Sequence, residues 1–150
     1  MPASNGSQNV GAGALFVSAS TQRVLLQLRA SYKSSHRNEW SLFGGMAKID
    51  ETPSEAMLRE CEEEVGQLPE ISKIYPFDIY ESRDKNFRYY TFIVIIEDEF
   101  QATINDESIG YGWFDFGVWP KPMHIGARNT LCSKKAQALL EIIIGQHQSN

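Results

Sequence analysis

The sequence predicts an α/β fold in which helices pack against a β-sheet. Three observations support this prediction. Short apolar runs alternate with polar turns along the chain, as strands do. Residues 89–96 are apolar at nearly every position, which is typical of a central strand covered on both faces. Residues 52–65 and 130–144 instead repeat apolar side chains at helical spacing, and 150 residues fit one domain.

The N-terminal part is expected to form a tail followed by a hairpin. Residues 1–12 are rich in Ser, Asn, Gln and Gly and predict a flexible tail, which leaves residues 13–147 for the single domain. Two short apolar runs, residues 14–17 and 23–29, flank the polar residues 18–22. They predict two strands joined by a turn.

The middle and the end of the chain continue this alternation. Residues 30–39 are polar and predict an exposed loop, and Gly44 with Gly45 is expected to end the strand that follows it. Strands are further expected at residues 40–43, 75–79, 89–96 and 113–114. Residues 130–144 predict one helix that ends at Gly145. One side of this helix is expected to carry Leu131, Ala138, Leu139, Ile142 and Ile143.

Composition limits the classes of partner. The chain has 14 basic and 19 acidic residues and a net charge of −5, so we do not expect nucleic acid held mainly through its phosphates. Its longest apolar run, residues 92–96, is far shorter than the roughly 20 residues of a membrane-spanning helix. Cys61 and Cys132 lack the spacing of metal ligands, and the N-terminus lacks a secretory signal. We therefore expect reduced thiols, no membrane partner and a cytoplasmic location.

The clearest local signal begins at Thr52. Thr52, Pro53 and Glu55 form a capping box with proline at the first helical position, so a helix is expected to run through residue 65 and to end at Gly66. The apolar stripe of this helix comprises Met57, Leu58, Cys61 and Val65.

Three glutamates lie on a different face of the same helix. Glu60, Glu63 and Glu64 are spaced i, i+3 and i+4, so their carboxylates converge, whereas Glu62 points to solvent. Like charges one turn apart cost only a few tenths of a kcal/mol, so one interpretation is a solvated acidic face or an acidic interaction surface without a metal. Grouped carboxylates also hold Mg²⁺ or Mn²⁺, which bind phosphate oxygens and activate water.

The segment from Gly45 to Gln67 resembles the Nudix box, the sequence signature of the Nudix hydrolase superfamily. The matching fixed positions are Gly45, Glu51, Arg59, Glu60, Glu63, Glu64 and Gly66, with Cys61 at the internal apolar position. Gln67 stands at the final apolar position, and Phe43 stands where the family commonly has proline before its glycine pair. The resemblance implies a Nudix-type α/β/α sandwich with a mixed central sheet.

The resemblance also implies roles for the acidic residues. Glu60 and Glu64 would be the central ligands of Mg²⁺ or Mn²⁺, with Glu63 completing the cluster and Gly45 offering its main-chain carbonyl. Glu107 lies in a downstream acidic loop that supplies a further ligand or the catalytic base in many members. The candidate catalytic residues are therefore Glu60, Glu63 and Glu107, and the base is left open between Glu60 and Glu107.

Other candidate residues concern the loop before the helix and the substrate. Arg59 with Glu51 resembles the structural ion pair of the family, although an ordinary i,i+4 pair between Arg59 and Glu63 is an equal alternative. Arg29 ends the second predicted strand beside the basic stretch of the chain and could hold a phosphate oxygen bidentately. Arg29, Trp40 and Tyr111 are the candidate substrate-binding residues.

The resemblance implies hydrolysis of a pyrophosphate bond in a nucleoside diphosphate linked to another moiety. A dNTP, a dinucleoside polyphosphate, ADP-ribose and a nucleotide-sugar all remain open as substrates. The alternative is a non-catalytic Nudix-fold sensor that binds a nucleotide without cleaving it. Many members of the family form dimers, so a homodimer is also a possibility.

Overall fold

The structure is a computed structural model that describes residues 8–30 and 38–147. In this part of the chain, seven strands form one sheet and three helices pack against it. The strands are β1 (Asn9–Ser18), β2 (Arg23–Arg29), β3 (Trp40–Ser41), β4 (Phe43–Met46), β5 (Lys73–Glu81), β6 (Phe87–Ile96) and β7 (Ser108–Asp115). The helices are α2 (Pro53–Val65), α3 (Ile125–Cys132) and α4 (Lys134–Gln146).

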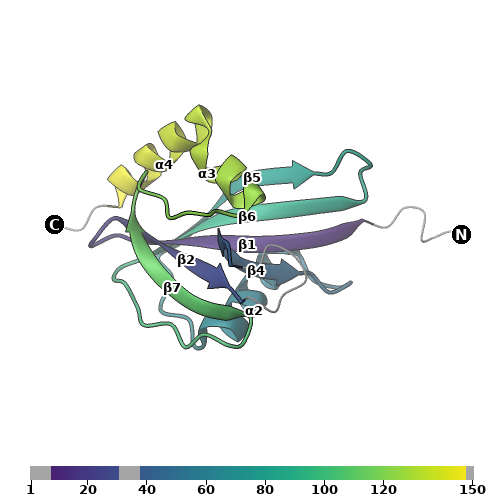
Figure 1. Cartoon of the computed structure of the whole chain (residues 1–150), viewed down its shortest axis with the longest axis horizontal. Coiled ribbons are helices and arrows are strands. Elements are labelled where there is room, and N and C mark those ends of the chain that lie inside the picture. Colours follow the sequence, from purple (N-terminus) through teal and green to yellow (C-terminus); the bar gives the residue numbers. More distant parts are fainter. Residues whose placement is uncertain (1–7, 31–37, 148–150) are drawn as a thin grey trace, which may run out of the picture.

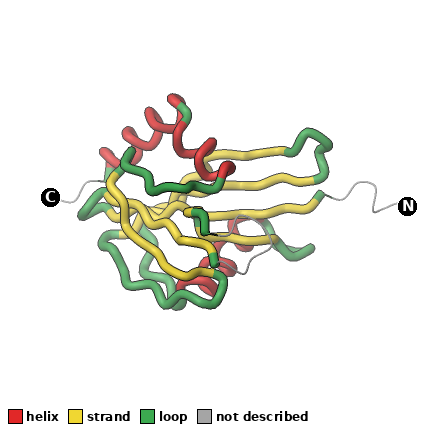
Figure 2. Tube along the Cα trace, in the orientation of Figure 1, coloured by secondary structure: helices red, strands yellow, loops and turns green. Residues whose placement is uncertain are grey.

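The sheet is mixed, and β1 lies at its centre. β1 runs parallel to β6 along its whole length and antiparallel to β2 and β4. β7 and β3 extend the sheet beyond β2, and β5 pairs with β6 at the other edge. Figure 1 shows α3 and α4 above the sheet and α2 below it, and Figure 2 shows the same three layers by secondary structure. The predicted α/β/α sandwich with a mixed sheet is therefore confirmed.

Each face of the sheet has its own apolar core. On one face, Met57, Cys61 and Val65 of α2 are buried against β1, β4 and β6, which confirms the predicted apolar stripe. On the other face, residues such as Leu15 of β1 pack against Leu140 of α4 and its neighbours. Alternate residues of β1 feed the two cores, because successive side chains of a strand point to opposite faces.

The first strand begins earlier than the sequence predicted. β1 starts at Asn9, so residues 9–12 belong to the sheet and not to the flexible tail expected over residues 1–12, of which residues 1–7 lie outside the described part. The ring of Tyr89 on β6 occupies the space beside Gly11, where an added Cβ would lie 2.7 Å from its Cδ1 atom. A strand segment that must leave room for a ring lacks the large apolar side chains that identify strands in a sequence.

The glycine pair lies inside a strand and does not end one. Trp40 and Ser41 form β3, and a second short strand, β4, then carries Gly44 and Gly45. β4 pairs with β1 so that Gly13 faces Gly44 across the ladder. An added Cβ at Gly44 would overlap the backbone of β1, so this position tolerates no side chain.

The predicted single C-terminal helix is two helices. Ser133 separates α3 from α4 with extended backbone, and its hydroxyl caps α4 by accepting a hydrogen bond from the Ala136 N–H at 3.1 Å. The break changes which side of the segment faces the sheet, so that Ile142, expected in the core, is 59% exposed. The buried residues of α4 are Ala136, Leu140, Ile143 and Ile144.

None of the described helices is long and apolar enough to cross a membrane. Of the predicted loop 30–39, residues 31–37 lie outside the described residues. Residues 18–22 connect β1 to β2 as expected, and residues 97–107 form a long connection from β6 to β7 that returns to the C-terminal end of α2.

Candidate functional site: an acidic face on α2

The helix that carries the glutamates begins and ends where the sequence predicts. The Thr52 hydroxyl accepts a hydrogen bond from the Glu55 N–H at 3.2 Å, and the Glu55 carboxylate accepts one from the Thr52 N–H at 2.9 Å. This reciprocal capping box satisfies two donors that a helix N-terminus would otherwise leave unpaired. Gly66 ends the helix with φ of +86°, a conformation that favours glycine.

Glu64 is the buried member of the acidic face. The residue is 3% exposed, and one carboxylate oxygen accepts a hydrogen bond from the Gly44 N–H at 2.7 Å. Burial raises the pKa of Glu64 to about 8, and the negative charges of Glu107 and Glu60 act in the same direction. The Gly44 hydrogen bond and the Arg29 charge oppose this shift without cancelling it. β4 and α2 are therefore joined at the carboxylate itself.

Glu60 lies directly beside Gly45. A Cβ added at Gly45 would overlap the Glu60 carboxylate, so glycine leaves the space that this carboxylate fills. Burial raises the pKa of Glu60, and the charges of Glu63 and Glu107 raise it further. Glu60 and Glu63 thus lie close together on the helix, as their spacing predicted.

Arg59 makes both of the contacts that the sequence left as alternatives. Its guanidinium binds the Glu51 carboxylate through two atoms, with Nε–Oε2 at 2.6 Å and Nη2–Oε1 at 2.8 Å. The same side chain donates to the Met46 main-chain oxygen at 3.0 Å and contacts Glu63 at 3.2 Å. The hydrogen bonds from Arg59 lower the pKa of Glu51 to about 2. This bidentate pair fixes the loop between β4 and α2 against the helix.

Glu107 reaches the same face from the connection between β6 and β7. Its negative charge raises the pKa of both Glu60 and Glu64, which places it near them. Asn105 donates from Nδ2 to the Glu63 main-chain oxygen at 3.1 Å and accepts the Glu107 N–H at Oδ1 at 2.9 Å. The connection is thereby attached to α2 next to the acidic face.

Arg29 lies near these glutamates. Its charge lowers the pKa of Glu64, and the N–H of the following residue, Ala30, donates to the main-chain oxygen of Glu107 at 2.9 Å. Tyr111 supports the nearby connection, since its hydroxyl accepts the Ala102 N–H at 3.1 Å. Trp40 lies apart from the glutamates. It packs in the core between the sheet and α3–α4, with its ring 5.1 Å from that of Phe114 in an edge-to-face arrangement.

The donor set of this acidic face is suited to a hard cation. The Glu60 carboxylate fills the space that Gly45 leaves, and carboxylate oxygens are the ligands that Mg²⁺ and Mn²⁺ prefer. Within residues 8–30 and 38–147, no three Asp, Glu, His or Cys side chains stand close enough together to hold an ion without moving. Glu63 instead points to Arg59, and its side chain is 54% exposed, so a rotation is inexpensive.

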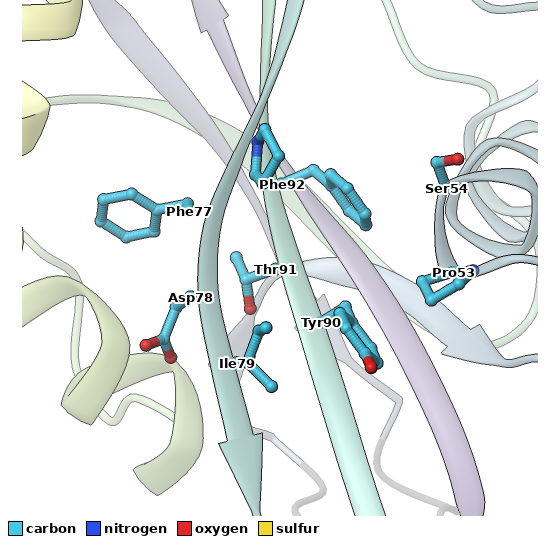
Figure 3. Close-up of a pocket in the computed structure, with 9 residues that line it drawn as sticks. Pro53, Ser54, Phe77, Asp78, Ile79, Tyr90, Thr91 and Phe92 are labelled. Atoms are coloured by element: carbon cyan, nitrogen blue, oxygen red, sulfur yellow. The ribbon is translucent and has the colours of Figure 1, made fainter.

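Two other features lie outside the acidic face. A cavity of about 560 Å³ lies between the first turn of α2 and the strands β5 and β6, and the described residues that line it include none of the α2 glutamates. Figure 3 shows Tyr90 and Phe92 pointing from β6 toward Pro53 and Ser54 across this cavity. Cys61 is fully buried, and burial raises the pKa of its thiol, which agrees with an inert packing role.

Two residues that shape the acidic face were not predicted from the sequence. Gly44 supplies the N–H that binds Glu64, and Asn105 links Glu63 to Glu107. The glycine pair signalled that the backbone approaches something closely, but it did not indicate what. Asn105 gave no signal of its contact with α2, because the Glu63 main-chain oxygen lies 42 positions away in the sequence.

The fold is an α/β/α sandwich in which an acidic helix packs against a glycine pair. Comparison with known protein families identifies the family to which the chain belongs. The NUDIX domain model matches residues 7–133, which is most of the chain. The chain therefore belongs to the Nudix family. A comparison with curated protein sequences found no match.

Solved structures share the fold. The Nudix hydrolase RenU from M. smegmatis has a TM-score of 0.67 and 20% identity, covering 96% of this chain and 89% of that one. The MutT NUDIX hydrolase from Burkholderia pseudomallei has a TM-score of 0.65 and 23% identity over 83% and 96% of the two chains. The NUDIX domain of Shewanella oneidensis NrtR, solved with ADP ribose, has a TM-score of 0.68 and 16% identity over 95% and 93%.

Proposed function

We propose that this protein is a divalent-metal-dependent hydrolase of a pyrophosphate bond in a nucleoside diphosphate linked to another moiety. The substrate classes are a dNTP, a dinucleoside polyphosphate, ADP-ribose or a nucleotide-sugar. The observation that carries the proposal is that the Glu60 carboxylate lies against Gly45, while the charge of Glu107, from a distant connection, raises the pKa of both Glu60 and Glu64. Membership of the Nudix family supports it.

Glu60, Glu63, Glu64 and Glu107 would hold Mg²⁺ or Mn²⁺ together with the main-chain carbonyl of Gly45. When bound, such an ion lowers the pKa of water and neutralises charge on phosphate oxygens. Glu60 or Glu107 takes the proton from the attacking water, since burial and neighbouring charge raise the pKa of Glu60 toward the range of a useful base.

Arg29 is the proposed contact for a substrate phosphate. Arg29 ends β2 beside Ala30, whose N–H donates to the main-chain oxygen of Glu107. The charge of Arg29 lowers the pKa of Glu64. A guanidinium at this position binds phosphate oxygens in a bidentate manner and offsets the negative charge that the glutamates bring to the substrate.

The test is a screen of about twenty nucleotide diphosphate derivatives with product identification, each with Mg²⁺, with Mn²⁺ and with EDTA. We expect product from at least one derivative with metal and none with EDTA. Glu64→Gln should reduce turnover by about two orders of magnitude or more, whereas Glu62→Gln, on the solvent side of the same helix, should retain it.

Three outcomes would overturn this proposal. Binding of a nucleotide without product under either metal would assign the protein as a nucleotide-binding sensor. Full metal-dependent activity in Glu64→Gln would show that the acidic face of α2 is not the metal site. Absence of both binding and a thermal shift with Mn²⁺ would leave an acidic surface without a metal.

A further inference from the structure

The connection between β6 and β7, residues 97–107, is attached both to α2 and to β7. The Thr103 N–H donates to the Val65 main-chain oxygen at 2.8 Å, at the end of the helix. The Ala102 N–H donates to the Tyr111 hydroxyl at 3.1 Å, and the Phe100 ring packs edge-to-face against Trp113. These contacts hold the connection in place, and none of them involves Glu107.

Asn105 contacts both α2 and the backbone of Glu107, a residue whose main-chain oxygen also accepts the Ala30 N–H at 2.9 Å. Its amide nitrogen donates to the main-chain oxygen of Glu63, and its amide oxygen accepts the N–H of Glu107. A main-chain oxygen can only accept and a main-chain N–H can only donate, so the two partners fix the orientation of the amide. The Asn105 side chain therefore links α2 to Glu107, two residues further along the connection.

This link works against a repulsion. Glu107 adds a negative charge to a face that already carries Glu60 and Glu64, and the charge of Glu107 acts on both. Like charges in a partly buried setting move apart unless other contacts hold them. The Asn105 amide is neutral, so it holds the backbone of Glu107 next to α2 without adding charge to the group.

We propose that Asn105 is a positioning residue that holds Glu107 at the acidic face of α2 through its two-ended amide bridge. This inference rests on the proposed function, in which Glu107 is a metal ligand or the base. Asn105 itself is not a catalytic residue, because its amide is occupied by two main-chain groups. It acts through the position of Glu107.

The test is a double-mutant cycle with Asn105→Ala, Glu107→Gln and the double variant. In the wild-type background, Asn105→Ala should lower kcat about tenfold or more, with KM changed less, because misplacing a reacting group reduces rate more than affinity. In the Glu107→Gln background, Asn105→Ala should have little further effect. Asn129→Ala, an exposed asparagine on α3, serves as the matched control and should leave kcat unchanged.

Three readouts that do not depend on turnover accompany the cycle. Hydrogen exchange of the Glu107 amide in the metal-free protein should be faster in Asn105→Ala, because that amide loses its acceptor. Mn²⁺ affinity measured by calorimetry should fall in Asn105→Ala and in Glu107→Gln, without an additive loss in the double variant. The thermal midpoint should change little, since the contacts at Thr103 and Tyr111 remain.

The outcomes separate the two proposals. An active wild type in which Asn105→Ala leaves kcat and Mn²⁺ affinity unchanged, or lowers them equally in both backgrounds, overturns the role of Asn105 alone. A wild type that neither binds Mn²⁺ nor releases product overturns the proposed function, and this inference with it. A wild type that binds Mn²⁺ without turnover still tests Asn105 through the affinity cycle.

Discussion

Glu64→Gln should make the metal-free protein more stable than the wild type at pH 8. Burial of Glu64, which is 3% exposed, raises its pKa from 4.5 to about 8, so the folded state holds a proton that the unfolded chain releases. The stability associated with this proton is fully present below pH 4.5 and is lost as the pH rises toward 8. At about 1.4 kcal/mol per pKa unit, the loss has an upper limit of about 5 kcal/mol.

The glutamine variant isolates this contribution. Its amide has nearly the shape of the carboxyl group and keeps an oxygen that can accept the Gly44 N–H, but it does not titrate. Urea unfolding in EDTA, between pH 5 and pH 8, would give the free energy of unfolding of both proteins. We expect the wild type to lose up to about 1.4 kcal/mol per pH unit relative to Glu64→Gln.

A matched control and a refuting result complete this test. Glu62→Gln removes an exposed carboxylate from the same helix and should follow the pH dependence of the wild type. Parallel stability curves for the wild type and Glu64→Gln would refute the reasoning, since Glu64 would then titrate alike in the folded and unfolded chains. Mn²⁺ at pH 8 should stabilise the wild type more than Glu64→Gln, because a ligand of the folded state favours folding.

Two further predictions concern the neighbours of the glutamates. Gly45→Ala adds a Cβ that meets the Glu60 carboxylate, so kcat should fall about tenfold or more while the thermal midpoint changes little; an unchanged kcat would show that this close approach is dispensable. Arg59→Lys keeps the charge but loses the two-atom contact with Glu51 and the bond to the Met46 oxygen, so kcat/KM should fall. A kcat/KM equal to that of the wild type would contradict this role of Arg59.

The features predicted correctly from the sequence are local. The capping box of α2 involves Thr52 and Glu55, which lie three residues apart, and hydrogen bonds within one turn depend little on the rest of the fold. The apolar stripe and the convergence of Glu60 with Glu63 likewise follow from the period of one helix. The sandwich itself was expected from the resemblance of residues 45–67 to the Nudix box.

The features that were missed depend on contacts between distant segments. The burial of Glu64 requires β4, which brings the Gly44 N–H from 20 residues upstream. β1 starts at Asn9 because it pairs there with β6, and the Tyr89 ring of β6 fills the space beside Gly11, which explains the glycine in a segment that looked like a tail. The break at Ser133 was masked because apolar residues continue at helical spacing on both sides of it.

The acidic face of α2 gathers carboxylates in a way that does not stabilise the fold. Three carboxylates on one exposed helix face would cost little. Here Glu64 is instead buried, and the charge of Glu107 raises the pKa of both Glu60 and Glu64. A marginally stable domain gains nothing in folding from this arrangement, and perturbed groups of one sign gathered by separate elements are typical of functional sites. Glu60 and Glu64 lie in the segment that resembles the Nudix box, which is why the proposed function is centred on α2 and not on the apolar cavity beside β5.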